Sequence, residues 1–548
     1  MYDYKPIQKR PEPPTENEVL IKVYATTCQI EDVKIRGFKI SHFGKESSKM
    51  IKGLFLSFLL ISVLVTINAQ EIQVSTEQII NLKPGRHLFI DDYIVAQSKG
   101  LESTLHQPVK MGSPVLEGMG SDDNNFQPYA TVLYDKQRQR FRIWYCSRVN
   151  RDEGIMLSYA ESVDGINWEK PYQELFEIYG FGCSVIDDGP EATIPERRYK
   201  MIYWELGNPE RHYYNNAAAG LGVSFSADGL NWVRQHPHPV LPDLWSHSVK
   251  GDPEHKGSIK WREYAADIVH ATWDPIRNIY VAYVKSWTWP PDEFGYISPT
   301  SDGMGRRLVS MTSSSDFVHW SKPVRSFLPQ PDDFSSLEFY ACRAKPRGNQ
   351  MINFSCILNE EIEGKSGSGI GYTVLSVSND LVNWNRMKEP WLPRSNENPE
   401  AADHAVAWVA DVITVGDDEF IYYGGYSDGH KSYDDRTINL AHLRKDGFVS
   451  RDAGKKEGRL LTKILRLDAG DLTINANVSG ILQMRVLEPS GKPLKGFGKN
   501  EIELIRGDAT NHRVKTKGNL ASLAGKPVRL EFFLRDAKLY GFELHETK

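Results

Sequence analysis

The sequence predicts an all-β protein, a five-bladed β-propeller followed by a small C-terminal β-sandwich. The first observation is a seven-residue phrase, Ser162-Val-Asp-Gly-Ile-Asn-Trp168, that returns at 226–232, 314–320 and 378–384. Each copy has Ser two residues before an Asp and Trp four residues after it. A degraded fifth copy at 443–448 ends in Phe448. The Asp-to-Asp steps of 64, 88, 64 and 66 residues indicate five β-rich units, one of which carries an insertion of about 24 residues.

Each unit contains three short strand-like runs separated by turn residues. The expected strands are 129–134, 140–147 and 155–162, then 183–187, 199–205 and 220–226, then 267–273, 279–285 and 307–312, then 338–344, 350–357 and 371–377, and last 406–415, 419–425 and 438–443. In every phrase we expect the Asp to accept backbone N–H bonds in a tight turn. The Trp should pack between neighbouring sheets. These Asp residues are therefore predicted to be structural, because a catalytic group needs no copy in every repeat.

The segments outside the five units complete the predicted organisation. The propeller spans 85–449, and its opening strand, 87–95, is expected to pair with the last blade and close the ring. A polar linker at 450–459 leads to residues 460–548, where alternating apolar residues at 472–478, 481–487, 528–534 and 537–544 predict the sandwich.

Residues 50–69 are typical of a secretory signal peptide, with Lys52 before an apolar run and Ala69 at the expected cleavage site. A membrane anchor is the alternative, but the apolar run 53–67 is short for a membrane span. We therefore expect a secreted or periplasmic protein with no membrane span after cleavage, and we interpret residues 1–49 as an upstream extension with no part in function.

Composition restricts the classes of function. The net charge of −5 and the absence of a Lys/Arg cluster give no reason to expect a nucleic-acid partner. The chain contains 13 Trp and 25 Tyr, and such aromatic side chains are common on the surfaces of proteins that bind sugars. Beyond the signal peptide, Cys146, Cys183, Cys342 and Cys356 have no metal-ligand spacing. Export permits disulfides, and buried free thiols are the alternative.

Candidate site residues lie where the innermost strand of each blade begins, because these strands line the central channel. The candidates are Asp122, Asp123, Asp187, Asp267, His270, Glu338, Arg343 and His404. Several carboxylates aimed at one axis raise one another's pKa, which favours a functional site. The insertion in the third unit adds Trp287 and Trp289, which could stack on a sugar ring or pack against the neighbouring domain.

Several phrases resemble secreted, family-32-like proteins of bacteria that degrade polysaccharides. They are Phe89-Ile-Asp-Asp-Tyr93, the run 273–283, Asp446-Gly-Phe-Val449, Ile505-Arg-Gly-Asp508 and the run 523–529. The predicted architecture is similar to that of family 32 and family 43 glycoside hydrolases. The family 32 signature Trp-Met-Asn-Asp-Pro-Asn-Gly is absent, which argues against a fructan substrate.

The resemblance implies a glycosidase that acts on carbohydrate through two carboxyl groups and requires no cofactor. It implies Asp123 as base or nucleophile with Asp122 as the substitute, Asp267 as a substrate-orienting acid and Glu338 as proton donor. Arg343 and His404 would bind substrate hydroxyls, and an inward His404 could support a structural Ca²⁺ ion.

Two alternatives remain open from the sequence. One is a sialidase-like hydrolase, because the repeated phrase is similar to the sialidase Asp-box. The other is a propeller that binds glycans without cleaving them.

Overall fold

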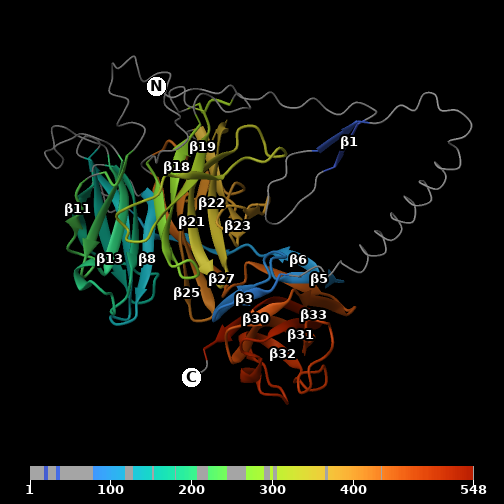
Figure 1. Cartoon of the computed structure of the whole chain (residues 1–548). Helices are drawn as coiled ribbons and strands as arrows, with labels where there is room; N and C mark the ends of the chain where they lie inside the picture. The colour runs from blue at the N-terminus through green and yellow to red at the C-terminus, as the bar shows by residue number, and fades with distance from the viewer. Residues whose placement is uncertain are drawn as a thin grey trace, which may run out of the picture. The chain divides into compact units, whose positions relative to one another are not determined.

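The computed structural model describes two separate units of the chain. The residues described are 18–21, 33–36, 78–117, 127–150, 154–178, 180–205, 220–237, 239–242, 267–288, 296–299, 305–363, 368–432 and 435–546. Unit 1–77 contributes one antiparallel pair, β1 (Glu18–Ile21) and β2 (Val33–Arg36). Unit 78–548 holds the remaining elements (Figure 1). The predicted signal peptide, 50–69, lies outside the described residues.

The all-β class is confirmed. Apart from short 3₁₀ turns at Pro195–Arg197 and Leu520–Leu523, every regular element in the described part of the chain is a strand. None of the helical turns in these residues is long and apolar enough to cross a membrane.

Five groups of antiparallel strands follow the five predicted units, and we call each group a blade. Blade one holds β8 (Gln127–Asp135), β9 (Arg140–Asn150), β10 (Gly154–Ser162) and β11 (Glu169–Ile178). Blade two holds β12 (Gly180–Asp187), β13 (Tyr199–Glu205), β14 (Gly220–Ser226), β15 (Val233–Arg234) and β16 (Leu241–Pro242). Blade three holds β17 (Val269–Asp274), β18 (Ile279–Trp287), β19 (Arg307–Ser314) and β20 (Val324–Phe327).

Blades four and five form one continuous sheet. Blade four holds β21 (Glu338–Arg347), β22 (Gln350–Glu363), β23 (Ser368–Ser378) and β24 (Asn385–Arg386). Blade five holds β25 (Val406–Val415), β26 (Asp418–Tyr426) and β27 (Arg436–Arg444). The two groups are joined by a single parallel pair between Gly371 and Val406.

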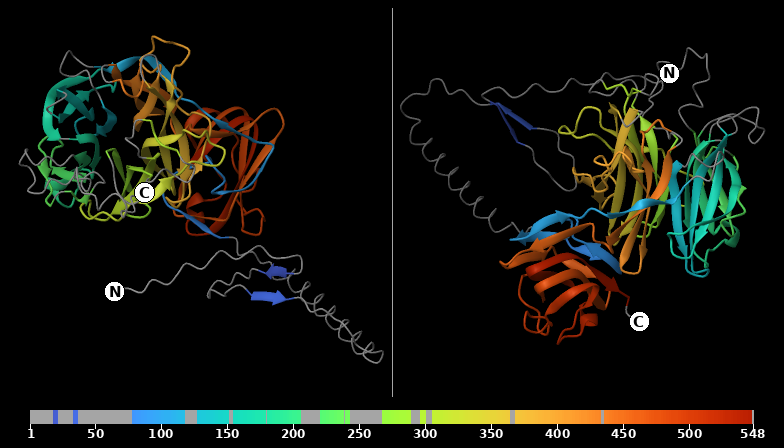
Figure 2. Two further views of the ribbon diagram at one scale, coloured as in Figure 1. Left: turned by 90° about the horizontal axis from the view of Figure 1, so that it is seen from above. Right: turned by 180° about the vertical axis from the view of Figure 1, so that it is seen from behind.

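The first strands of the blades contact one another in a closed cycle. β8 contacts β12, β12 contacts β17, β17 contacts β21, β21 contacts β25, and β25 returns to β8. Seen from above, the sheets are arranged around a common centre (Figure 2). We interpret this cycle as a five-bladed propeller.

The ring is closed by a strand other than the one we predicted. β7 (Val109–Leu116) pairs with β27 as the outer strand of blade five. Lys110 anchors β7, because its ammonium lies 2.5 Å from the buried carboxylate of Asp403. The predicted closing segment, 87–95, instead begins in β4 (Gly85–Leu88), which pairs with β33 (Pro527–His545) of the C-terminal sheet. β4 pairs with the stretch Gly541–Leu544 of the long β33, so the earlier strand joins the C-terminal sheet and a later strand is left to close the ring.

The repeated phrases form the turns that were expected of them. In the first copy, the Oδ1 atom of Asp164 accepts backbone N–H bonds from Ile166 and Asn167 at 2.8 Å. Ser162 Oγ accepts the N–H of Gly165 at 2.9 Å. The other three copies repeat this pattern at Asp228, Asp316 and Asp380. The residue after the Asp has a left-handed backbone, with φ of +77° at Gly165 and +67° at Phe317. The four Asp residues are turn residues, as predicted.

The aromatic residue of each phrase packs on the preceding blade. The ring of Trp168 lies 5.9 Å from that of Tyr422 in blade five. Trp384 of blade four lies 4.8 Å from Phe327 in blade three. In the degraded fifth copy, Phe448 lies 5.7 Å from Phe354 of blade four. Each phrase therefore joins two blades.

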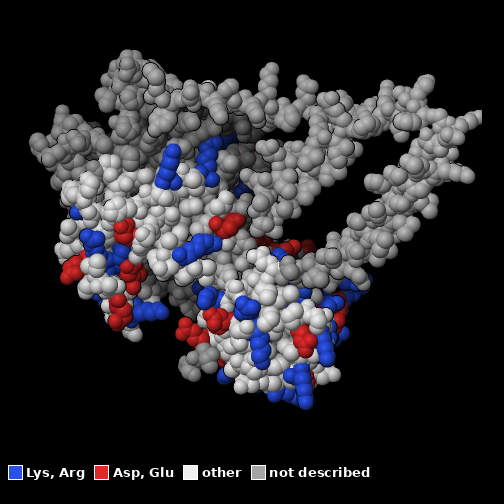
Figure 3. All heavy atoms as spheres, in the orientation of Figure 1, with Lys and Arg blue, Asp and Glu red and all other residues white. Residues whose placement is uncertain are grey.

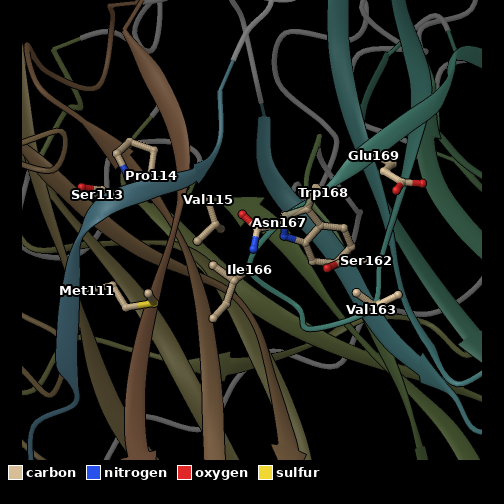
Figure 4. A pocket seen from close by; sticks show the side chains of 10 residues that line it. All are labelled: Met111, Ser113, Pro114, Val115, Ser162, Val163, Ile166, Asn167, Trp168 and Glu169. Atoms are coloured by element: carbon tan, nitrogen blue, oxygen red, sulfur yellow. The ribbon is translucent and has the colours of Figure 1, made fainter.

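A surface groove lies where the closing strand meets the first of these turns (Figure 4). It has a volume of about 520 Å³ and runs between β7 and the turn after β10. Its lining residues are Met111, Ser113, Pro114, Val115, Ser162, Val163, Ile166, Asn167, Trp168 and Glu169. The groove marks the junction of blades five and one.

Replacing Asp228 with Ala should lower the free energy of unfolding by about 1 kcal/mol, the typical loss when a capping side chain is removed. Burial opposes ionisation of Asp228, but the N–H donors of Asn231 and Leu230 outweigh it and lower its pKa to about 2. Since the folded-state pKa is depressed, this stability is present above pH about 4 and is lost as the pH falls toward 2. Urea unfolding at pH 7 and at pH 3 should give a smaller difference between wild type and Asp228→Ala at pH 3. An equal difference at both pH values would contradict this account.

The C-terminal sheets also recruit strands from before the propeller. β31 (Asp471–Leu487) and β33 are long strands with a register shift where we expected two shorter strands each. β32 (Ile505–Arg513) pairs with β31, and β30 (Leu465–Leu467) pairs with β33 and with β3 (Ile80–Leu82). The predicted linker, 450–459, holds most of β28 (Val449–Ala453) and the start of β29 (Gly458–Thr462). β28 pairs with β6 (Glu102–Leu105), and β29 with β5 (Val95–Lys99), so this segment belongs to the sheet.

On the face drawn in Figure 3, Lys and Arg side chains are interspersed with Asp and Glu. The described part of that face carries both signs of charge without a large patch of either.

Candidate active site

The first strands of four blades begin around one aromatic cluster. It contains Tyr129 of β8, Ile268 just before β17, Tyr340 of β21 and Trp408 of β25, all buried. The rings of Tyr340 and Trp408 stack with centroids 4.6 Å apart, and Tyr129 stacks on Tyr340 at 6.2 Å. These strand starts therefore converge, as expected, and the cluster forms an apolar base for the charged residues beside it.

Glu338 is the first residue of β21, and its side chain is 0% exposed. Its Oε1 atom accepts the backbone N–H of Arg307 at 2.9 Å, and its Oε2 atom accepts Arg307 Nη1 at 2.7 Å. Ser298 Oγ donates to Oε2 at 3.4 Å. Burial raises the pKa of Glu338, Arg307 opposes this, and the neighbouring Glu360 adds to it.

A second carboxyl group shares these donors. Glu360, near the end of β22, accepts Ser298 Oγ at 2.8 Å and lies 3.1 Å from Arg307 Nη1. Its other oxygen, Oε1, lies 3.2 Å from Nδ1 of His430. Burial lowers the pKa of His430 to about 3, so this imidazole is neutral at pH 7. Because two buried carboxyl groups share one guanidinium, it is unfavourable for both of them to be ionised at the same time.

Arg307 connects the carboxyl groups to the aromatic base. Its guanidinium lies 4.4 Å from the centre of the Trp287 ring and 5.5 Å from that of Tyr340. Trp287 is only 6% exposed, and one face of its ring is covered by Arg307. Trp287 therefore packs within its own blade, on Arg307, and not against the neighbouring domain.

Asp267 and Lys285 form an ion pair beside the same base. The ammonium of Lys285 lies 4.4 Å from the centre of the Tyr340 ring. Burial lowers the pKa of Lys285, and the Asp267 carboxylate opposes this. The side chain of Asp267 is 27% exposed, in contrast to that of Glu338. The structure therefore brings Asp267, Glu338 and Trp287 into one cluster.

Arg343 and His270 lie deeper, between the first strands. Arg343 donates to Nδ1 of His270 and to the carbonyl of Ala130. Nε2 of His270 lies 3.2 Å from the carbonyl of Ala344, which makes it the protonated nitrogen. Burial lowers the pKa of His270 well below its usual value, in keeping with this neutral form. These contacts join blade four to blade three through His270 and to blade one through Ala130.

Asp187 and His404 have other partners. Asp187 ends β12, and its carboxylate binds Arg198 through two hydrogen bonds of 2.7 and 2.9 Å. Nδ1 of His404 lies 3.3 Å from the carbonyl of Ser395. Asp122, Asp123 and Trp289 lie outside the described residues.

The described residues do not form a metal site. No three His, Cys, Asp or Glu side chains among them lie together as ligands. A Ca²⁺ ion near His404 stays a prediction, because backbone carbonyl and water oxygens are also calcium ligands. The four described cysteines, Cys146, Cys183, Cys342 and Cys356, are buried free thiols.

Sequence reasoning missed Arg307, Glu360, His430 and Lys285. Within their blades, these residues lie at the end of the second strand, at the start of the third strand or in the loop between the two. Antiparallel pairing places these positions beside the start of the first strand. The one available signal was the acidic run Asn359-Glu-Glu361 after an apolar strand.

No protein-family model and no curated protein matches the chain. Solved structures similar to it include a glycoside hydrolase at 15% identity and a TM-score of 0.41, covering 62% of this chain and 92% of that one. A glycosyl hydrolase from Bacteroides ovatus has 14% identity and a TM-score of 0.39, covering 62% and 94%. A family 32 β-fructofuranosidase from Bombyx mori has 10% identity and a TM-score of 0.37, covering 81% and 94%. Function has to be argued from the site itself, because likeness at this level carries no argument about chemistry.

Proposed function

We propose that the protein is a secreted or periplasmic glycoside hydrolase that cleaves oligo- or polysaccharides by carboxylate acid/base catalysis. The observation that carries the proposal is Glu338, a buried carboxyl group whose pKa is raised and which shares its donors with Glu360. A glycosidase needs such a group, because its general acid must still hold a proton near neutral pH to protonate the leaving oxygen.

The roles follow from the contacts. Glu338 is the proton donor, and Arg307 and Ser298 fix its orientation. Glu360 helps to keep Glu338 protonated, since it raises the pKa of that carboxyl group. The partly exposed Asp267 binds a sugar hydroxyl group. Asp123, with Asp122 as the substitute, is the base or nucleophile, on the ground of its sequence position before the first strand of blade one.

A glycan-binding protein without catalysis is the second candidate, and one observation favours it. Both oxygens of Glu338 are already hydrogen-bonded to Arg307, which is also the arrangement of a permanent structural ion pair. In that case the cluster would shape a binding surface and transfer no proton.

An assay of the wild-type protein separates the two candidates. The substrates are a panel of aryl glycosides and of plant and algal polysaccharides, with released phenol and reducing ends as the measured quantities. Turnover of at least one substrate is expected. Binding of glycans by calorimetry without any turnover would establish the binding protein and reject the hydrolase.

A further inference from the structure

Lys431 lies in the loop between β26 and β27, beside the candidate active site. The preceding residue, His430, is fixed there by three contacts. Its N–H donates to the carbonyl of Gly369 at 2.9 Å, its carbonyl accepts Arg436 Nη2 at 3.1 Å, and its ring lies 4.8 Å from that of Tyr340. This loop therefore holds Lys431 next to the carboxyl–guanidinium cluster.

The electrostatic surroundings of Lys431 are those of the site. Burial lowers the pKa of Lys431, and Arg307 and Lys285 lower it further, while Glu360 and Asp267 oppose the change. The side chain is half-buried. The position of Lys431, one residue after the His430 that contacts Glu360 and Tyr340, agrees with this influence and places Lys431 beside the cluster.

Every other described charge in the cluster has a partner. Asp267 pairs with Lys285, and Glu338 pairs with Arg307. Glu360 pairs with Arg307 and contacts His430. Among the described residues, Lys431 has no ion pair or hydrogen bond from its ammonium group. A half-buried cation beside two other cations is costly unless an anion joins it.

We propose that the site takes a sugar unit that carries a negative charge, either the carboxylate of a uronic acid or a sulfate ester, and that Lys431 binds this group. The inference rests on the proposed function and specifies its substrate class. A neutral sugar would leave the ammonium group without a directly hydrogen-bonded anion, whereas an anionic unit forms a charge-assisted hydrogen bond in a partly dehydrated place. Lys431 would therefore select the anionic substrate, because the binding free energy of the charged sugar is more favourable than that of the neutral one.

Matched pairs of glycans test the proposal directly. The anionic members are polygalacturonate, glucuronoxylan and a sulfated galactan, and the neutral members are carboxyl-reduced polygalacturonate, xylan and the desulfated galactan. Binding is measured by calorimetry at 150 mM salt with Glu338→Gln, which prevents cleavage during the titration. The second variant adds Lys431→Met. The control adds Lys388→Met, which removes an exposed ammonium group paired with Asp332.

At least one anionic glycan should bind about 10- to 100-fold more tightly than its neutral match, the usual effect of one charge-assisted bond. Lys431→Met should abolish this preference, and Lys388→Met should leave it unchanged. Which pair shows the preference distinguishes carboxylate from sulfate.

Two results would overturn the proposal while leaving the proposed function intact. One is binding and cleavage of neutral glycans without preference for the charged form. The other is an equal loss of affinity for the anionic and the neutral member of a pair in Lys431→Met. That result would mean that Lys431 stabilises the protein and does not bind the charged group of the substrate. Absence of both binding and cleavage for every glycan would instead reject the proposed function together with this inference.

Discussion

Glu338→Gln is expected to lower kcat on a natural glycan by about 10²- to 10⁴-fold, the usual contribution of a general acid. Gln has nearly the same shape and still accepts a hydrogen bond from Arg307, but it has no acidic proton to give. Glycan binding, measured by calorimetry, should therefore change little. On a dinitrophenyl glycoside the loss should be much smaller, because that leaving group departs without protonation. The ratio of the two losses identifies the proton donor.

The control for this variant is Glu361→Gln, which removes an exposed carboxylate one residue after Glu360. It should keep kcat within about twofold of wild type, as most surface substitutions away from the reacting groups do. If Glu338→Gln lowered kcat equally on the natural glycan and on the dinitrophenyl glycoside, Glu338 would not be the general acid. Thermal unfolding of each variant distinguishes lost chemistry from lost fold.

The pH profile gives an independent reading of the same group. Because burial raises the pKa of Glu338, the protonated form persists to a higher pH than for an ordinary carboxyl group. Activity should fall as the pH rises through that pKa and the proton is lost. In Glu338→Gln the remaining activity should no longer show this alkaline fall.

The strand pattern and the turns could be predicted from the sequence because both depend on neighbours along the chain. Ser162 and Asp164 bind backbone groups within three residues, so the phrase carries its own geometry. The start of β21 at Glu338 follows from the same local pattern. These positions needed no knowledge of distant contacts.

The rest of the site depends on long-range contacts that no local pattern encodes. Glu360 and Glu338 are brought together by the pairing of β21 with β22, and Arg307 comes from the neighbouring blade. Arg343 illustrates the opposite case. It lies five residues after Glu338 on the same strand, but its guanidinium binds Ala130 of blade one and His270 of blade three.

The fifth copy of the repeated phrase also departs from its pattern for a long-range reason. Asp446 and Glu419 are both buried, and Arg347 binds both of them. Arg86, just before the propeller, adds a hydrogen bond of 2.9 Å to Asp446. The Asp of the fifth copy therefore joins blade four, blade five and the first strands of unit 78–548.

Arg347→Met should lower the free energy of unfolding by about 3–5 kcal/mol, since it leaves two buried carboxylates with Arg86 as their remaining cation. Urea unfolding at pH 7 measures this loss. The matched control is Arg513→Met, whose partner is Asp471 and whose side chain is 73% exposed. That exposed pair should contribute at most about 1 kcal/mol.

Adding Asp446→Asn to Arg347→Met decides between the two explanations of such a loss. If the loss comes from an uncompensated buried charge, removing one carboxylate should restore part of the stability lost in the single variant. If Arg347 acts through the packing of its hydrocarbon stem, the losses of unfolding free energy in Arg347→Met and in Asp446→Asn should add in the double variant. Recovery in the double variant would establish that the carboxylate of Asp446 acts as a counter-charge to Arg347 between blades four and five.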